Sequence, residues 1–248
     1  MDFTRPVTLR FYAELNDFLQ PERKQEACRR RVAPRTSVKD LIQSLGVPHT
    51  EVDLLLVDGV SASFDRLLEG GERVAVFPRF RRIDVETVSL VRTPAPLGRF
   101  VLDVHLGRLA TYLRLAGFDS VYRNDASDSD LSTTARQESR ILLTRDVGLL
   151  QRNEVACGYF VRETAPAAQL AEVIRRFDLA DEVRPFTRCL RCNVLVEAAS
   201  DTSVRERVPP RVRERHVEFS RCPACSRVYW KGTHYEWMVR LLATLTTP

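Results

Sequence analysis

The first eighty residues combine short apolar runs with one amphipathic segment. Residues 7–12, Val-Thr-Leu-Arg-Phe-Tyr, alternate apolar and polar side chains with period two, which predicts a strand. In residues 36–45 the apolar positions follow helical spacing behind a Thr-Ser pair suited to cap a helix. Residues 54–57 and 74–78 are apolar runs bounded by Gly or Pro, which favours strands. This order predicts a small β-grasp domain over residues 1–80.

After residue 80 the pattern changes twice. Residues 81–97 are charged and then contain Thr93-Pro-Ala-Pro, a composition typical of a linker. From residue 98 apolar runs of strand length alternate with amphipathic helical segments. The expected strands cover 100–104, 118–122, 141–144 and 158–161, and the expected helices cover 106–113, 131–138 and 167–177. Such alternation predicts parallel βαβ units in a three-layer α/β sandwich over residues 98–183.

Two cysteine pairs with identical spacing dominate residues 184–248. They are Cys189-Leu-Arg-Cys192 and Cys222-Pro-Ala-Cys225. Two residues between thiolates let one tight turn direct both sulfurs at a single ion, and two such pairs complete the tetrahedral shell of Zn²⁺. Two disulfides or a thioredoxin-like redox pair are the alternatives. We expect a structural zinc ribbon over 184–248, ending in a helix near residues 235–245.

Composition indicates an ordinary globular chain with one basic region. Of 248 residues, 44% are hydrophobic and 29% charged, and no apolar run approaches the roughly 18 residues that span a bilayer. The first ten residues do not resemble a signal peptide, so a cytoplasmic protein is expected. Residues 184–234 contain eleven Lys and Arg against five Asp and Glu, a net charge of +6, while the whole chain carries +5. The zinc ribbon is therefore predicted to face a polyanion, a solvated charged loop being the alternative.

Acidic residues directly follow three of the expected parallel strands. In an open parallel sheet the ligand crevice lies beyond the carboxyl ends of the strands. Carboxylates gathered there repel one another unless a cation neutralises them, and oxygen ligands at an open crevice favour Mg²⁺ or Mn²⁺. Such a site activates water for hydrolysis of a phosphodiester. The residues concerned are Asp103 after the first strand, Asp125, Asp128 and Asp130 after the second, and Asp146 after the third.

These acids also have structural interpretations. The three that follow the second strand are suited to form turns and to cap the next helix. Asp146 is adjacent to Arg145, a candidate ion-pair partner. Asp103 interrupts an apolar run, and a buried carboxylate requires a partner. Glu138, beside a strand start, is expected to be structural.

Between the cysteine pairs, an arginine-rich segment and several aromatic residues are candidates for RNA contact. We expect residues 204–216 to be extended and their arginines to follow a phosphate backbone. The aromatic residues either stack on unpaired bases or form the core of a small metal domain, and core is favoured for Trp230 and Phe219. The arginines are Arg205, Arg207, Arg211, Arg213 and Arg215, and the aromatic residues are Phe186, Phe219, Tyr229, Trp230, His234 and Trp237.

The N-terminal region resembles the ubiquitin-like sulfur carriers of molybdopterin and thiamine synthesis. The opening strand, Thr36-Ser-Val-Lys-Asp-Leu, Leu56-Val-Asp-Gly and Glu72-Arg-Val-Ala-Val-Phe-Pro match in order. Those carriers end in a free Gly-Gly that is thiocarboxylated, whereas this chain continues through Arg79-Phe-Arg-Arg. Sulfur transfer is therefore not expected, and residues 1–80 are predicted either to dock a protein partner or to cover the acidic site.

Residues 98–245 resemble the Mut-seven C-terminal RNase family. The resemblance is carried by Arg99-Phe-Val-Leu-Asp-Val-His-Leu-Gly-Arg-Leu, Arg140-Ile-Leu-Leu-Thr-Arg-Asp, Pro185-Phe-Thr-Arg-Cys-Leu-Arg-Cys-Asn and Val228-Tyr-Trp-Lys-Gly-Thr-His. That family implies a PIN-like nuclease domain fused to a zinc ribbon, sometimes after a ubiquitin-like domain. It implies Asp103, Asp128 and Asp146 as metal-binding acids, with Asp125 as a neighbour. Typical PIN domains have a helical Glu second and a fourth acid, neither of which is assigned here.

Together these observations predict a cytoplasmic ribonuclease that uses Mg²⁺ or Mn²⁺. Its zinc ribbon is expected to bind the RNA, such as tRNA or another structured RNA. Asp103, Asp128, Asp146 and Asp125 are the candidate catalytic residues. The alternative is an RNA- or ribosome-binding adaptor without catalysis, whose β-grasp domain recruits partners.

Overall fold

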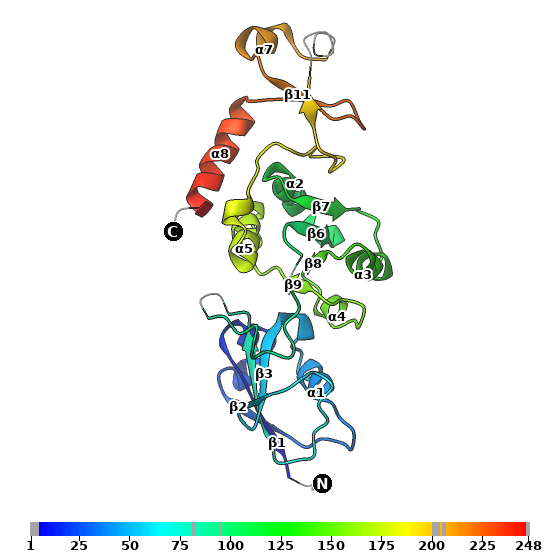
Figure 1. Ribbon diagram of the computed structural model, residues 1–248, viewed down its shortest axis with the longest axis vertical. Coiled ribbons are helices and arrows are strands. Elements are labelled where there is room, and N and C mark those ends of the chain that lie inside the picture. Colours follow the sequence, from blue (N-terminus) through cyan, green and yellow to red (C-terminus); the bar gives the residue numbers. More distant parts are fainter. Residues whose placement is uncertain (1–4, 81–82, 95, 200–203, 205–206, 247–248) are drawn as a thin grey trace. The chain divides into compact units, whose positions relative to one another are not determined.

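The computed structural model describes residues 5–80, 83–94, 96–199, 204 and 207–246 (Figure 1). Its contacts divide the chain into two compact units. The first contains Met1–Ala95 and Asp146–Phe160, and the second contains Pro96–Arg145 and Val161–Pro248. No helix among the described residues is long and apolar enough to cross a membrane.

The first unit is built on a five-stranded mixed sheet. Its order is β2-β1-β5-β3-β4, with the central pair β1–β5 parallel and the other pairs antiparallel. In β1 the alternating residues Val7, Leu9 and Phe11 are buried, as the period-two pattern predicts. This is the predicted β-grasp fold. Its strands are β1 (Val7–Phe11), β2 (Ala27–Arg30), β3 (Val52–Val57), β4 (Val60–Ser61) and β5 (Arg73–Pro78), with 3-10 turns η1 (Ala13–Phe18), η2 (Pro21–Arg23) and η3 (His49–Glu51).

Helix α1 (Val38–Ser44), the one α-helix described within residues 5–80, starts at a capping box. The Ser37 hydroxyl accepts a hydrogen bond from the Asp40 backbone N–H at 3.1 Å, and the Asp40 carboxylate accepts one from the Ser37 N–H at 3.4 Å. This reciprocal pair satisfies two backbone donors that a helix start leaves open. Val38 and Ile42 are fully buried in the hydrophobic core of the unit. The predicted helix is therefore confirmed.

Residues 83–94, within the expected linker, pack against the first unit. Val91 belongs to its hydrophobic core. The buried Asp53 carboxylate accepts a hydrogen bond from the Phe80 N–H at 3.1 Å and lies 3.6 Å from the Arg92 guanidinium. The Ser89 hydroxyl donates to the Asp53 carbonyl at 2.5 Å. One charged residue of this stretch, Arg92, thus neutralises the buried carboxylate of Asp53.

The segment Asp146–Phe160 belongs to the first unit although it follows β8 in the chain. It carries α4 (Val147–Leu150) and β9 (Gly158–Phe160). Gln43 and Gln151 exchange hydrogen bonds between side-chain amides and backbone carbonyls, at 3.0 and 3.1 Å. The imidazole of His49 lies 3.1 Å from the carbonyl oxygen of the fully buried Val155. Residues of the β-grasp domain therefore hold this segment directly.

Burial governs the charge of His49. Desolvation, assisted by the nearby Lys39 ammonium, lowers its pKa from 6.5 to about 4. The imidazole is therefore neutral at pH 7. In this form one ring nitrogen donates to the Val155 carbonyl, and the other accepts from Gln43, whose side-chain nitrogen lies 3.1 Å away.

The second unit is built on the parallel strands β7, β6 and β8, which lie side by side in that order. Strand β6 pairs in parallel with both neighbours, Leu102 lying opposite Tyr122 and Leu143. Helices α5 and α3 lie on opposite sides of the sheet (Figure 1), which makes the predicted three-layer α/β sandwich. The elements are β6 (Arg99–Leu102), η4 (Val104–Leu106), α2 (Gly107–Leu115), β7 (Asp119–Tyr122), α3 (Asp128–Gln137), β8 (Ile141–Thr144), α5 (Pro166–Phe177) and η5 (Ala180–Glu182).

Gly117 ends α2, as expected from the sequence. Its φ is +101°, a conformation that residues with a Cβ rarely adopt. An added Cβ would also collide with the carbonyl of Arg184, whose N–H bonds the Ala116 carbonyl at 2.9 Å. This glycine therefore allows the C-terminal part of the chain to pack against the end of α2.

Residues 184–246, called here the cysteine module, contain among their described residues a small antiparallel sheet and the helices α7 and α8. One expectation was wrong: within residues 204–216, Pro210–Arg215 form helix α7 and are not extended. Pro210 is the first helical residue, where its fixed φ favours a helix and its missing N–H costs no bond. The expected closing helix is α8, beside α5 (Figure 1). The elements are β10 (Glu197–Ala198), α7, β11 (Phe219–Arg221), β12 (Val228–Trp230) and α8 (Thr233–Thr246).

Candidate functional site

Asp103 directly follows the central strand β6 and is almost completely buried, with 5% of its surface exposed. One carboxylate oxygen accepts a hydrogen bond from the Thr144 hydroxyl at 2.6 Å, and the other accepts from the Val104 N–H at 2.6 Å. Thr144 is the last residue of the neighbouring strand β8. The partner that a buried carboxylate requires is thus a hydroxyl at the carboxyl end of the adjacent strand. Each Asp103 oxygen keeps further acceptor capacity.

We expect Thr144→Val to reduce the free energy of unfolding by about 1–3 kcal/mol, since it leaves the buried Asp103 carboxylate without its hydroxyl donor. Valine keeps the shape of threonine, so packing changes little. Denaturant unfolding would measure the loss. Thr144→Ser, which retains the hydroxyl, is the matched control and should lie closer to the wild type. Equal stability of the valine and serine variants would show that the hydrogen bond is unimportant.

Asp125 and Asp128 follow β7, which is parallel to β6. Asp125 is exposed and pairs with the Arg123 guanidinium at 3.1 Å, which holds the pKa of Asp125 below its usual range. Asp128 is exposed in the first turn of α3. Ser127 and Asp130 form the capping box of that helix, with hydrogen bonds of 3.1 and 3.2 Å. The capping role is therefore confirmed for Asp130, and Asp128 is not the cap.

Asp146 follows β8 and caps α4. Its carboxylate accepts hydrogen bonds from the N–H groups of Gly148 at 2.7 Å and Leu149 at 3.3 Å, and the residue is exposed. Arg145 donates at 2.8 Å to the carbonyls of both Arg162 and Glu163. The carboxylate of Glu138 forms an ion pair with the Arg140 guanidinium, with 2.7 Å between Oε2 and Nε. This ion pair supports the structural role expected for Glu138.

Among the described residues, no three of the candidate acids form a group positioned to share a metal ion. Across the part of the chain that the structure describes, the four cysteines are the only group of three or more His, Cys, Asp or Glu side chains positioned to share an ion. Asp103, Asp125 and Asp128 of the second unit are not such a group, and Asp146 belongs to the first unit. Joint binding of a cation by these carboxylates stays a prediction.

The sulfurs of Cys189, Cys192, Cys222 and Cys225 all lie within 4.8 Å of one another. The Sγ atoms of Cys189 and Cys225 are 3.6 Å apart, far beyond a disulfide bond of about 2 Å. Four sulfurs at about 2.3 Å from one ion would lie about 3.8 Å apart in a tetrahedron. All four are free thiols. The arrangement fits a tetrahedral zinc ion and does not fit disulfides.

Each cysteine pair forms the same kind of turn. The second cysteine donates its N–H to the sulfur of the first, at 3.3 Å in the first pair and 3.5 Å in the second. The residue after each pair, Asn193 or Ser226, has positive φ and donates its N–H to the carbonyl of the first cysteine at 2.9 Å. Backbone N–H groups directed at sulfur favour the thiolate, the form that binds metal.

The Tyr229 hydroxyl supports the first cysteine. It lies 3.1 Å from the Cys189 sulfur and accepts a hydrogen bond from the Leu190 N–H at 3.1 Å. Burial opposes ionisation of Cys189, but the hydrogen bonds from Tyr229 and from backbone N–H groups outweigh it and lower the pKa of that thiol. Contact with Cys225 and burial raise the pKa of Cys192. Four negatively charged sulfurs within 4.8 Å would repel one another, and a bound cation would neutralise that repulsion.

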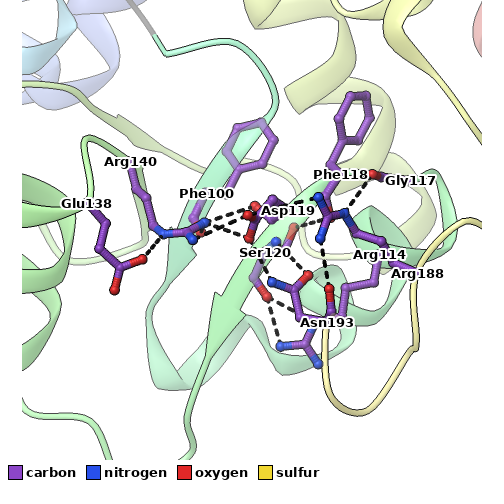
Figure 2. A network of polar contacts seen from close by, with 10 residues as sticks. All are labelled: Phe100, Arg114, Gly117, Phe118, Asp119, Ser120, Glu138, Arg140, Arg188 and Asn193. Carbon is purple, nitrogen blue, oxygen red and sulfur yellow. Dashed lines mark hydrogen bonds and ion pairs between the residues drawn. The ribbon is translucent and has the colours of Figure 1, made fainter. Parts of the chain in front are cut away.

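A partly buried polar network fixes the first cysteine turn to the edge strand β7 (Figure 2). The Asn193 side chain donates to the Asp119 carboxylate at 2.7 Å and accepts from the Ser120 N–H at 2.9 Å. Arg114 donates to the Ser120 carbonyl at 2.8 Å and to the Leu190 carbonyl at 2.9 Å. The cysteine module is thereby anchored to the α/β sandwich, so a ligand held by the module lies at a defined place on that domain.

Asp119 and Arg140 form the charged centre of the same network (Figure 2). Their charged groups are 2.7 Å apart. Burial disfavours the charged form of Asp119, but hydrogen bonds from Arg140 and Asn193 outweigh it and lower the pKa of Asp119. Desolvation lowers the pKa of the buried Arg114. These partners come from β7, from α2, from the residue before β8 and from the cysteine turn, so no local sequence pattern indicates the network.

The described arginines of the predicted RNA-binding segment are largely exposed. Arg207 donates to the Ser226 carbonyl at 3.3 Å. Arg211 and Arg215 are exposed one helical turn apart on α7, which places them on the same face. Arg213 is half-buried, and its Nε has no hydrogen-bond partner among the described residues. Arg205 lies outside the described residues.

Comparisons with known proteins identify two regions. The family model of the Mut7-C RNAse domain matches residues 98–242, more than half of the chain. The family model of the Mut7-C ubiquitin domain matches residues 4–84. No curated protein and no solved structure matches the chain.

Proposed function

We propose a metal-dependent ribonuclease activity, on the premise that the chain belongs to the Mut7-C RNAse domain family. The substrate would be RNA, and the reaction would be hydrolysis of its phosphodiester bonds. The environment of Asp103 carries the proposal. This buried carboxylate ends the central strand β6, and its hydrogen bonds leave acceptor capacity on both oxygens.

Parallel pairing supports a shared site for the other acids. Strands β7 and β8 run parallel to β6, and the register aligns the ends of all three strands. Asp125 and Asp128 follow β7, and Asp146 follows β8. The carboxyl ends of neighbouring parallel strands form the ligand crevice of an open α/β sheet. A site at this edge would therefore combine acids from three separate segments.

In this proposal Asp103, Asp128 and Asp146 hold Mg²⁺ or Mn²⁺ through carboxylate oxygens, with Asp125 beside them. When bound, the ion activates a water and neutralises charge on the scissile phosphate. Thr144 is a positioning residue, since its hydroxyl orients the Asp103 carboxylate. No side chain acts as a covalent nucleophile.

The cysteine module supplies structure and RNA contact in the same scheme. Its four thiolates would bind a structural zinc ion, as their mutual distances allow, and four protein ligands leave no position for a substrate. Arg207, Arg211 and Arg215 would contact RNA phosphates, together with the other predicted arginines, Arg213 and Arg205. Binding through phosphates weakens as salt concentration rises, so the affinity for RNA should fall with ionic strength.

A cleavage assay tests the proposal. Labelled RNA, both unstructured and tRNA-like, is incubated with the full chain in Mg²⁺, in Mn²⁺ and in Ca²⁺. We expect cleavage in Mg²⁺ or Mn²⁺ and much slower cleavage in Ca²⁺, which is larger and accepts looser coordination. Cleavage that is equally fast in all three ions, or that persists after catalytic metal is removed with the zinc retained, would contradict a Mg²⁺- or Mn²⁺-dependent site.

The alternative function is an RNA-binding adaptor without catalysis. It is supported by exposed apolar residues of the first unit, since Val60 is 71% and Leu90 is 65% exposed. Both line a cavity of about 560 Å³ beside β4, where a protein partner would bind. In that case the assay would yield bound but intact RNA with every ion.

A further inference from the structure

An aromatic pocket lies between α2 and the cysteine module. Its volume is about 850 Å³. Helix α2 forms one wall, and the first cysteine turn, β12 and the start of α8 form the others. The pocket contains both tryptophans of the chain. Its aromatic residues are Tyr112, Phe186, Tyr229, Trp230, Tyr235 and Trp237.

The rings of this pocket are only partly packed against one another. Trp237 meets Tyr112 edge-on with centroids 5.8 Å apart, and Phe186 lies 4.4 Å from Tyr235. Yet Trp230 remains 37% and Trp237 43% exposed. A core role, which the sequence favours for Trp230, would bury these rings. Large exposed aromatic surface in a concave site instead indicates a binding surface.

Three contacts preform the pocket. The Tyr229 hydroxyl contacts the Cys189 sulfur and the Leu190 N–H, both at 3.1 Å, so one wall is attached directly to the metal-binding turn. The indole of Trp230 lies over Gly232, where an added Cβ would come within 2.8 Å of its Nε1. Absence of a side chain at Gly232 therefore permits this ring position. A preformed pocket loses little entropy when a ligand binds.

The charges around the pocket favour an anionic ligand with flat apolar parts. None of its lining residues is acidic. Arg108 is exposed and precedes Thr111 and Tyr112 by one turn, on the face of α2 that lines the pocket. Lys231 follows Trp230, and its ammonium lies 6.0 Å from the Tyr235 ring. Glu218 pairs with Lys231 and offsets part of that charge.

We propose that this pocket binds an unpaired base of single-stranded RNA, stacked on Trp237 and Trp230, with the flanking phosphates near Arg108 and Lys231. The inference rests on the proposed function for the choice of RNA as the polyanion. Stacking on aromatic rings accepts any base, because every base has a π-face. The pocket would thus select unpaired segments without reading their sequence.

Intrinsic fluorescence provides a direct readout, because both tryptophans lie in the pocket. The experiment uses the full zinc-loaded chain carrying Asp103→Asn to prevent cleavage. A short oligoadenylate is compared with an abasic oligomer of the same length and charge. We expect saturable quenching by the oligoadenylate and little quenching by the abasic strand, with affinities that differ by about 5- to 100-fold.

Substitutions separate base stacking from general apolar binding. Trp237→Leu keeps an apolar side chain but removes the ring, and it should lower the affinity for labelled oligoadenylate by about 5- to 100-fold. Trp237→Phe should restore most of the loss. Val217→Ala, at a residue 95% exposed in the same module and outside the pocket lining, is the control and should bind as the wild type does. Zinc content and circular dichroism confirm that each variant is folded.

Two results would overturn the inference. One is equal affinity of base-bearing and abasic strands. The other is wild-type affinity of Trp237→Leu, which would show that the base does not stack on this ring. Neither result would contradict the proposed ribonuclease activity if the wild-type chain cleaves RNA. Conversely, base-dependent quenching by a chain that never cleaves RNA would support the pocket and refute the nuclease.

Discussion

Asp103→Asn is expected to slow RNA cleavage at least about a hundredfold in Mg²⁺ or Mn²⁺. The substitution removes a negative charge from the proposed ligand set, and loss of even an outer-sphere partner typically costs 10- to 100-fold in metal affinity or activity. It preserves the volume of the side chain and allows hydrogen bonding to Thr144 and Val104 to continue in part. Initial cleavage rates at saturating metal, measured on one labelled RNA, would give the ratio.

Asp130→Asn is the matched control for this change. It also converts an aspartate near the carboxyl end of β7 to asparagine, but the Asp130 carboxylate is committed to the capping box of α3. Its cost should be on the order of 1 kcal/mol of helix stability, without loss of cleavage. Equal rates for wild type and Asp103→Asn would remove Asp103 from the catalytic site. If both variants slowed RNA cleavage equally, the cause would be a disturbed fold and not the loss of a metal ligand.

Cys189→Ser is expected to release zinc and unfold the cysteine module. Structural zinc contributes binding free energies of about 10–16 kcal/mol in small zinc-binding peptides, and this energy is folding energy. Cys189 is fully buried, and its sulfur also contacts the Tyr229 hydroxyl. Metal content measured by mass spectrometry of the native protein should fall from one zinc per chain to none. Hydrogen exchange should rise throughout β10, β11 and β12.

Cys28→Ser is the control, because Cys28 is a half-buried free thiol of β2 outside the four-cysteine group. It should retain the zinc and the protection of the module. The α/β sandwich should survive Cys189→Ser, since Phe100, Leu109 and Ile141 of its own strands and helices are fully buried. A module that stays folded and retains its metal after Cys189→Ser would contradict the structural zinc site.

Local patterns predicted much of the fold. The period-two strand β1, the capped helix α1 and the alternating strands and helices of the sandwich are encoded within a few turns of chain. The two cysteine pairs are likewise local, because each turn positions its own two sulfurs. The Mut7-C resemblance is confirmed over both regions. Each strand, helix and cysteine turn is indicated by one short segment, and the family resemblance rests on several such segments in order.

Contacts between distant segments could not be predicted in the same way. Thr144 supports Asp103 across a strand pair, and Tyr229 supports Cys189 from forty residues away. Neither residue is distinguished by its own neighbours in sequence. Helix α7 was missed because Pro and Arg dominate its sequence, and Pro favours extended structure except in the first helical turn.

The contacts of segment Asp146–Phe160 with residues 1–80, which the sequence did not predict, change the role expected for residues 1–80. Residues 1–80 were expected to dock partners, but Gln43 and His49 hold this segment, which begins at a proposed metal ligand. Removing residues 1–80 would therefore disturb the proposed catalytic acid Asp146 as well as any docking surface. Point substitutions on the exposed surface of residues 1–80 would test partner docking without disturbing the segment that begins at Asp146, whereas truncation would affect both.

In the proposed site, aspartates from separate segments bind one hard cation. Electron paramagnetic resonance of Mn²⁺ titrated into the zinc-loaded chain measures this binding without reference to cleavage. The wild type should bind Mn²⁺ with an affinity that falls at least about tenfold in Asp103→Asn and in Asp146→Asn, and that is unchanged in Asp130→Asn. If the Asp103 and Asp146 variants bind Mn²⁺ as tightly as the wild type does, the aspartates do not form a metal site and the ribonuclease mechanism proposed here is wrong.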